Sequence, residues 1–215
     1  MSNKFILICT FLVLLLSSSG IAAEEFDNKD PFTLVQEVSQ ELFTRIANEQ
    51  SIIQQDPERL RLVVEEQLAP YINHRYAGAK VLGKKFYNKT PPEMRETFYN
   101  AFREYLIATY AGILTLYKDQ QVVFEPSSPV KGKIVQVNVR VLDKGRPDIN
   151  IGFKLRKNKQ NEWSAFDMVA EGISVLNSKQ KELQGLIRQQ GVDSVTKLLL
   201  EKAAKPIKVK EIGNR

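Results

Sequence analysis

The sequence predicts an α+β fold, with several helices packed around a roughly four-stranded antiparallel sheet. One observation is the alternation of apolar and polar residues over residues 133–157, which predicts strands with one buried face. A second is the apolar spacing of three and four residues over much of 30–118 and 177–205, which is typical of helices. A third is the shortness of the breaks between the alternating runs, which favours antiparallel hairpins.

The strands give the clearest pattern. Apolar and polar residues alternate within each of two runs. The apolar residues are Val135, Val137, Val139 and Val141 in the first run, and Ile149, Ile151, Phe153 and Leu155 in the second. Turn-forming residues fill 143–147 and 158–161. Residues 162–169 continue the sheet, and residues 121–125 predict one further strand. Helices must cover the apolar face of this sheet, and they either fill it completely or leave room for a ligand.

Residues 1–23 predict a secretory signal peptide that is cleaved. Lys4 precedes an apolar run over residues 5–16, and small residues follow as far as Ala23. An uncleaved membrane anchor is the alternative, but the run is shorter than the roughly 20 apolar residues of a spanning helix. A lipoprotein signal needs a cysteine at the cleavage point, whereas Cys9 lies inside the apolar run.

Cleavage after residue 23 leaves 215 − 23 = 192 residues, enough for one domain. That domain is expected over 24–205, with a helical part at 30–118, the sheet at 121–170 and C-terminal helices at 177–205. Residues 206–215 are predicted to form a loose tail. The only cysteine leaves with the signal peptide, so the exported chain has no disulfide.

Capping residues mark the helix starts in the first half of the chain. Asp30 and Asp56 each precede a proline, which is typical of an N-cap followed by the first helical residue. A short helix is expected from Pro70. The sequence TPPE at 90–93 predicts a capping box that opens the longest helix, which extends to about Tyr117. This helix is apolar over a wide arc, so we expect it to cover the sheet face.

Two helices are expected after the sheet. Asn177 starts the first, and Gly191 ends it. Asp193 caps the second, and Pro206 ends it.

Catalysis and metal binding have little support in the sequence. His74 is the only histidine, and no nucleophile motif or phosphate-binding glycine loop accompanies it. Asp167 lies in an otherwise apolar strand, where a carboxylate can be a perturbed acid or base. We favour the interpretation that Asp167 is a hydrogen-bonded cap or an ion-pair partner. No cofactor and no metal are expected.

The net charge of +6 comes from basic residues that are spread along the chain. Nucleic-acid binding would favour one dense basic patch with interleaved aromatic residues, so no nucleic-acid partner is expected. The charges indicate either a solvated surface or attraction to anionic membranes and acidic partners.

Three segments carry a resemblance to a known family: PYINHRYAGAKVLG at 70–83, FYNAFREYL at 98–106 and WSAFDMVAEGIS at 163–174. With the signal peptide and the order of elements, the chain resembles the MlaC family over residues 30–205. These are periplasmic phospholipid-binding proteins of the maintenance-of-lipid-asymmetry pathway in Gram-negative bacteria, also called the toluene-tolerance family. The resemblance implies a twisted sheet similar to that of nuclear transport factor 2-like folds, with an apolar lipid pocket between sheet and helices.

The resemblance also implies a function. The family is not catalytic and carries phospholipid, with two acyl chains buried, between an outer-membrane lipoprotein complex and an inner-membrane ABC transporter that has an MCE-domain subunit. We therefore expect a periplasmic monomer. An enzyme on a nuclear transport factor 2-like fold and a docking protein with a filled core are the alternatives.

Apolar residues on the two facing surfaces are the candidates for lipid contact. A carrier must hide acyl chains from water, so its pocket has to be dry. The predicted lipid-binding residues are Leu106 and Ile113 on the long helix, and Val137, Val139, Ile151 and Phe153 on the sheet.

Overall fold

The helices come first along the chain, the sheet follows, and one long helix closes it. The computed structural model describes residues 26, 28–118, 120–127, 129–142 and 147–209. The helices before the sheet are α1 (Pro31–Asn48), α2 (Gln50–Gln55), α3 (Arg59–Gln67), the 3-10 turn η1 (Ala69–Tyr71), α4 (His74–Lys89) and α5 (Pro92–Leu114). The remaining elements are β1 (Gln121–Phe124), β2 (Ile134–Leu142), β3 (Ile149–Lys157), β4 (Trp163–Ala170), β5 (Ile173–Ser174) and α6 (Val175–Ala203). The α+β prediction is confirmed.

The sheet is an antiparallel meander with the order β1-β2-β3-β4-β5. It has five strands rather than roughly four, because the two-residue β5 pairs with the end of β4. Val139 pairs with Ile151, and Val137 pairs with Phe153, so the predicted apolar residues share one face. The predicted turn at 158–161 forms, and the Oδ1 atom of Asn158 accepts the backbone N–H of Glu162 at 2.9 Å. Of the other predicted turn, residues 143–146 lie outside the described residues.

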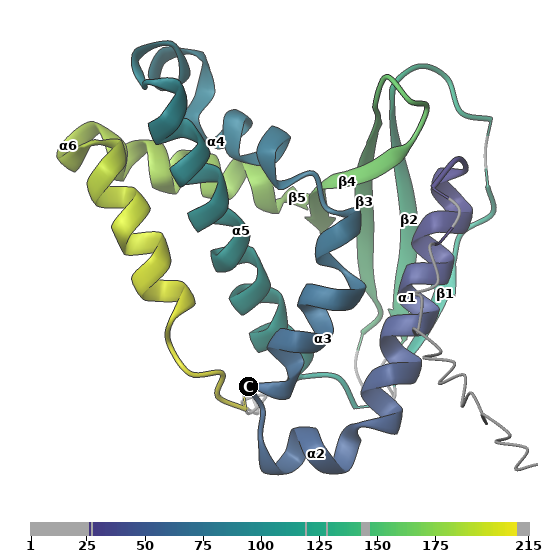
Figure 1. Ribbon diagram of the computed structural model, residues 1–215. Helices are drawn as coiled ribbons and strands as arrows, with labels where there is room; N and C mark the ends of the chain where they lie inside the picture. Colours follow the sequence, from purple (N-terminus) through teal and green to yellow (C-terminus); the bar gives the residue numbers. More distant parts are fainter. Residues whose placement is uncertain (1–25, 27, 119, 128, 143–146, 210–215) are drawn as a thin grey trace, which may run out of the picture.

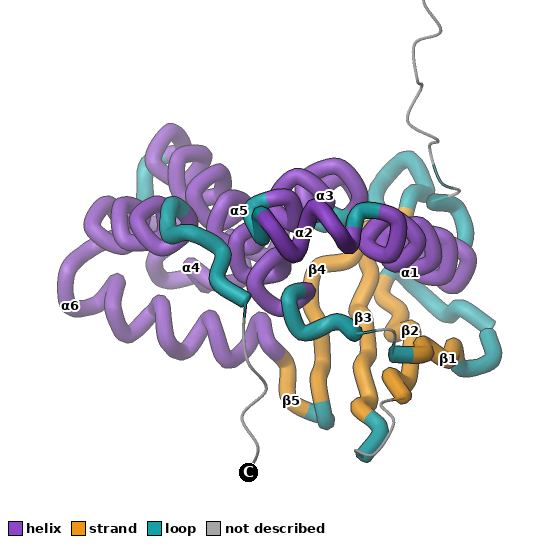
Figure 2. Tube along the Cα trace, turned by 90° about the horizontal axis from the view of Figure 1, so that it is seen from below, coloured by secondary structure: helices purple, strands orange, loops and turns teal. Residues whose placement is uncertain are grey.

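Two helical groups surround the sheet face (Figures 1 and 2). The first is α1, whose Leu34, Val35 and Val38 share a buried cluster with Val137 and Leu155. The second consists of α4, α5 and α6, which pack on one another, and α5 also packs on α3. The helix predicted to be the longest and to cover the sheet is α5. The longest helix is instead α6, and α1 packs directly on the sheet, whereas α5 faces the sheet across a cavity.

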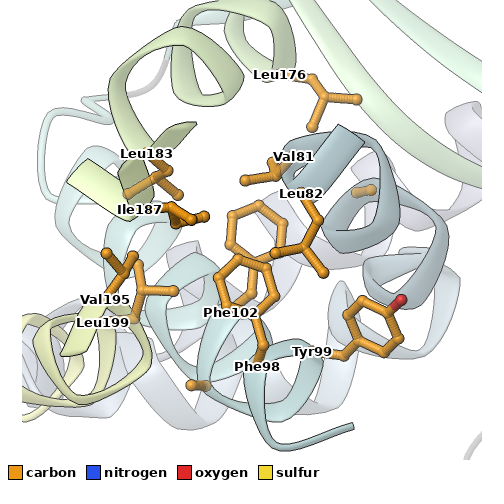
Figure 3. Packing of buried hydrophobic residues seen from close by; sticks show 12 residues of the cluster. Val81, Leu82, Phe98, Tyr99, Phe102, Leu176, Leu183, Ile187, Val195 and Leu199 are labelled. Carbon is orange, nitrogen blue, oxygen red and sulfur yellow. The ribbon is translucent and has the colours of Figure 1, made fainter. Parts of the chain in front are cut away.

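The group of α4, α5 and α6 has a core of its own. Figure 3 shows Phe98 and Phe102 of α5 between Val81 of α4 and Leu183 of α6. The two rings are nearly parallel, with centroids 6.2 Å apart. On its other side α5 contributes Ile107 to a cluster with α1, α2 and α3. The wide apolar arc of α5 thus reflects two cores, one on each side.

The predicted N-cap at Asp30 is confirmed, whereas the one at Asp56 is wrong, because α3 begins at Arg59 with Glu58 as its N-cap. The Oδ2 atom of Asp30 accepts the N–H of Thr33 at 2.7 Å, as expected of an N-cap. The capping box at 90–93 is wrong, because the hydroxyl of Thr90 instead donates to the carbonyl of Phe86 at 2.7 Å, at the end of α4. The short helix expected from Pro70 is a 3-10 turn, after which α4 begins.

The other ends of the long helices also differ in detail. α5 ends at Leu114 rather than near Tyr117. α6 begins after Ser174 rather than at Asn177, because the Oγ atom of Ser174 accepts the N–H of Asn177 at 3.0 Å. The helix end predicted at Gly191 is a break inside α6, where φ is +82°.

Gly83 breaks α4 in the same way, with φ +65° and ψ 164°. The backbone carbonyls before the break are bound by glutamine side chains of α6. The Nε2 atom of Gln184 donates to the carbonyls of Val81 at 3.0 Å and Leu82 at 3.2 Å. A long-range amide contact therefore replaces the helical hydrogen bonds that the break removes.

The chain end is tied to α3. Ile207 is buried, and its N–H donates to the Oε1 atom of Glu58 at 2.5 Å. The guanidinium of Arg61 donates to the carbonyls of Ala203 at 2.9 Å and Lys205 at 3.2 Å. The Ile207 N–H and the Arg61 guanidinium hold the pKa of Glu58 below its usual value. The prediction of a loose tail is therefore wrong at Ile207, and residues 210–215, like the predicted signal peptide at 1–23, lie outside the described residues.

The two breaks allow a matched test by alanine substitution. Both glycines have backbone angles that cost other residues on the order of 1–3 kcal/mol. A Cβ atom at Gly83 would also lie 2.5 Å from the Nε2 atom of Gln184, whereas a Cβ atom at Gly191 would meet nothing within 4 Å. We expect Gly83→Ala to lower the free energy of unfolding by about 1 kcal/mol more than Gly191→Ala, because the Gln184 amide must leave two carbonyls. Urea unfolding of both variants measures this, and equal losses would contradict it.

Candidate functional site

A cavity of about 370 Å³ lies between α1, α5, the start of α6 and the sheet. This volume falls in the range of small-molecule sites, about 300–1000 Å³. Most of its lining side chains are aliphatic or aromatic. Those with a polar group are Ser39, Tyr71, Tyr110, Tyr117, Gln120, Asp167 and Lys179. A cavity of this composition offers dispersion contacts and shelter from water to an apolar ligand.

One wall is the apolar face of the sheet. Val139 of β2 lies beside Ile151 of β3, and Phe153 lies beside Met168 of β4. All four line the cavity. A register shift between β3 and β4 places Lys154 opposite Asp167 and Leu155 opposite Ala165, so Phe166 is an extra residue in β4. Such a bulge redirects side chains, and Phe166 also lines the cavity.

The opposite wall belongs to α5 and α1. Leu106, Tyr110, Ile113 and Leu114 follow helical spacing along α5. The cavity opens to solvent at one end, because two large apolar residues of its lining are exposed. Ile113 is 39% exposed, and Ile149, at the start of β3, is 43% exposed. Apolar groups left exposed around an opening are typical of a binding site rather than of a closed core.

Five of the six predicted lipid-binding residues line this cavity. They are Leu106, Ile113, Val139, Ile151 and Phe153. Val137 does not line it: its side chain is 1% exposed and packs in the cluster beneath α1. The reason is the position of α1, which covers the sheet at Val137, whereas the cavity begins at Val139. Contact between these residues and lipid remains a prediction.

Several lining residues were not predicted. Leu34, Val35, Val38 and Leu42 of α1 line the cavity and lie within the helical spacing over 30–118, which predicts a helix but not a cavity wall. Their spacing is that of any buried helix face, so the sequence contains no signal for the cavity. Lys179 was not predicted either, because a single lysine near a helix start has the pattern of a surface residue.

Asp167 is a structural residue, as the sequence interpretation favoured. Its Oδ1 atom accepts the N–H of Leu176 at 2.9 Å, and its Oδ2 atom accepts the hydroxyl of Ser174 at 2.8 Å. The Nζ atom of Lys154 lies 3.4 Å from Oδ2. The carboxylate therefore joins β4 to the first turn of α6.

Two other titratable residues remain neutral near pH 7. Burial raises the pKa of the Tyr110 phenol to about 12, and the nearby Asp167 and Tyr105 add to the shift. Burial, together with the nearby Arg103, lowers the pKa of His74. His74 does not line the large cavity. Among the described residues, the charged groups of the cavity lining are thus one hydrogen-bonded carboxylate, Asp167, and one ammonium, Lys179.

No grouping of three histidine, cysteine or acidic residues that could hold a metal ion occurs within the described part of the chain. Among the same residues, none of the helices has the length and apolar character needed to cross a membrane.

Comparisons with known proteins agree with this picture. The family model described as MlaC protein matches residues 36–201. The chain is 34% identical over 201 residues to the intermembrane phospholipid transport system binding protein MlaC of Haemophilus influenzae, which covers 92% of this chain and 94% of that protein. It is 20% identical over 163 residues to the toluene tolerance protein ttg2D of Pseudomonas putida, with coverage of 76% and 75%.

A solved structure supports the fold. The phospholipid-binding protein from Ralstonia solanacearum, determined in complex with a phospholipid, matches with a TM-score of 0.72 at 20% identity. The match covers 81% of this chain and 97% of that chain. The resemblance noted in the sequence is thereby confirmed. Because the family model spans most of the chain and the Haemophilus relative aligns over nearly its whole length, the chain belongs to the MlaC family.

Proposed function

We propose that this protein is a phospholipid carrier, the binding protein of an intermembrane phospholipid transport system. The observation that carries the proposal is the open apolar cavity, in whose described lining Asp167 and Lys179 are the two charged side chains. The Haemophilus relative is named as such a binding protein, and the Ralstonia protein was solved with a phospholipid. The MlaC family is one of transport proteins and not of enzymes.

The energetics explain why the cavity is apolar. Two acyl chains of roughly 15 methylenes each gain on the order of 24 kcal/mol on leaving water, at about 0.8 kcal/mol per methylene. A bilayer offers the same gain, so a carrier needs a site of comparable quality. The side chains of Val139, Ile151, Phe153 and Leu106 form such a surface. The lipid headgroup remains in contact with solvent outside the apolar part of the cavity.

The proposal includes the route of the lipid. The carrier crosses the periplasm as a monomer and docks on an outer-membrane lipoprotein complex and on an inner-membrane ABC transporter with an MCE-domain subunit. The spread of lysine and arginine over the surface favours weak docking that salt reduces, because exposed charges act within a Debye length of about 8 Å at physiological salt.

Lipid bound to the purified protein is the direct test. We expect native mass spectrometry of protein prepared without detergent to show an added mass equal to that of a phospholipid, and an organic extract to contain the same lipid. Acyl chains in a dry cavity exchange slowly with water because of the transfer energy given above. A single lipid-free mass together with an empty extract would contradict the carrier proposal and favour a filled-core docking protein.

A pair of glutamate substitutions separates the cavity wall from the core. Ile151 lines the cavity, whereas Val137 lies on the same sheet face but is packed beneath α1. We expect Val137→Glu to unfold the protein, because a buried unpaired carboxylate costs several kcal/mol. Ile151→Glu is expected to fold and to lack lipid, because water enters the emptied cavity and solvates the carboxylate.

Thermal unfolding and lipid content of both variants are measured, with Ile151→Val as the conservative control. Loss of folding in both glutamate variants would show that Ile151 is core. Full lipid content in folded Ile151→Glu would show that this wall does not contact lipid.

Export is tested by the N-terminus of the protein recovered from cells. We expect a periplasmic extract to contain a chain that begins near Glu24, because the apolar run at 5–16 is too short to span a bilayer. N-terminal sequencing measures this. A chain that retains Lys4 and is found only in carbonate-washed membranes would indicate an anchor instead.

A further inference from the structure

The two charges of the cavity lining are not balanced to the same extent by neighbouring groups of the protein. Among the described residues, Asp167 and Lys179 are the formally charged side chains that line the cavity. The carboxylate of Asp167 is occupied by Ser174, by the N–H of Leu176 and by Lys154, so its charge is balanced within the fold. Lys179 also has an anionic partner, Glu182, but it shares that carboxylate with a second lysine, Lys202.

Lys179 lies on α6, next to the aromatic side chain of Tyr105 on α5. Its Nζ atom is 5.5 Å from the centre of the Tyr105 ring and 2.7 Å from the Oε2 atom of Glu182. The same carboxylate also faces Lys202, whose Nζ atom is 3.6 Å from Oε1. Two ammonium groups thus share one carboxylate, and the cluster of Lys179, Glu182 and Lys202 carries one excess positive charge.

The protonation states support this count. Burial lowers the pKa of Lys179, but hydrogen bonds to Glu182 and Tyr105 outweigh that effect and raise it. The hydrogen bond from Lys179 lowers the pKa of Glu182. Lys179 and Glu182 are therefore both charged at neutral pH. The Lys179 side chain is only 27% exposed, so solvent screens its charge less than that of a surface lysine.

We propose that Lys179 binds the phosphodiester anion of the lipid whose acyl chains occupy the cavity. The inference rests on the proposed function, because it assumes that the tails lie against the apolar walls. A phosphodiester joins the tails to the headgroup, so the anion comes to the polar part of the wall when the tails are buried. Lysine interacts with phosphate as a point charge with three rotatable donors.

This placement predicts that the protein selects lipids by the presence of the phosphate group and not by the identity of the headgroup. The other lysines and arginines of the described residues do not line the cavity. A lipid with the same tails and no phosphate would leave the excess charge of the cluster unbalanced. The protein should therefore prefer a phospholipid to a diacylglycerol with identical acyl chains.

The test is a competition between two lipids. Delipidated protein is incubated with detergent micelles that contain equal amounts of dioleoyl phosphatidylglycerol and dioleoylglycerol, and the bound lipids are quantified by mass spectrometry after gel filtration. Lys179→Met keeps the apolar stem and removes the charge, and Lys179→Arg keeps the charge. Lys181→Met is the matched control, because Lys181 is exposed on the same helix and does not line the cavity.

We expect the wild type and Lys181→Met to prefer phosphatidylglycerol, and Lys179→Met to lower that preference about tenfold, which corresponds to about 1.4 kcal/mol. Lys179→Arg should retain most of it. An unchanged preference in Lys179→Met, with both lipids still bound, would overturn the role of Lys179 and leave the carrier function standing. Failure of the wild type to bind either lipid would overturn both.

A further arm distinguishes a lipid phosphate from a free one. Glycerol 3-phosphate, which has the anion without acyl chains, is added at millimolar concentration. We expect it not to displace bound phosphatidylglycerol, because it gains nothing from the apolar walls. Displacement that is lost in Lys179→Met would show a site for free anions and would overturn the proposal.

Discussion

The apolar face of the sheet can stay partly uncovered because the helices are attached to the sheet at separate points. At one side, Leu34 of α1 and Val137 of β2 belong to one buried cluster. Next to it, the N–H of Asn73 donates to the carbonyl of Ala165 on β4 at 2.7 Å. Two residues further along β4, the Asp167 carboxylate holds the first turn of α6. These attachments fix the distance between the walls, so the space between them need not be filled to be stable.

The two charged residues of the cavity lining differ in role because they differ in position relative to these attachments. Asp167 lies at an attachment, where backbone and side-chain donors surround its carboxylate. Lys179 lies one turn further along α6, beyond the attachment, and shares a single carboxylate with Lys202. A buried charge that builds the fold is satisfied by the fold, whereas a charge in excess remains available to a ligand.

Most helices and strands could be predicted from the sequence, whereas the boundary of the cavity could not. Alternation predicted β2 and β3 and their shared apolar face, because the period of a strand is fixed by its geometry. Val137 and Val139 are identical in type and face, yet only Val139 lines the cavity, because the boundary depends on where α1 crosses the sheet. The misassigned cap at Thr90 has a local cause, since its hydroxyl had two possible partners, one on each side along the chain.

The contact between Ile207 and Glu58 has a consequence for the order of folding. Ile207 completes a cluster built from α1, α2, α3 and α5, all of which precede it by many residues. An exported chain crosses the inner membrane from its N-terminus onward, and its early segments meet the periplasm first. Under the proposed export, that cluster would not close until Ile207 had also crossed. Ile207 would therefore couple the completion of this core to a late stage of translocation.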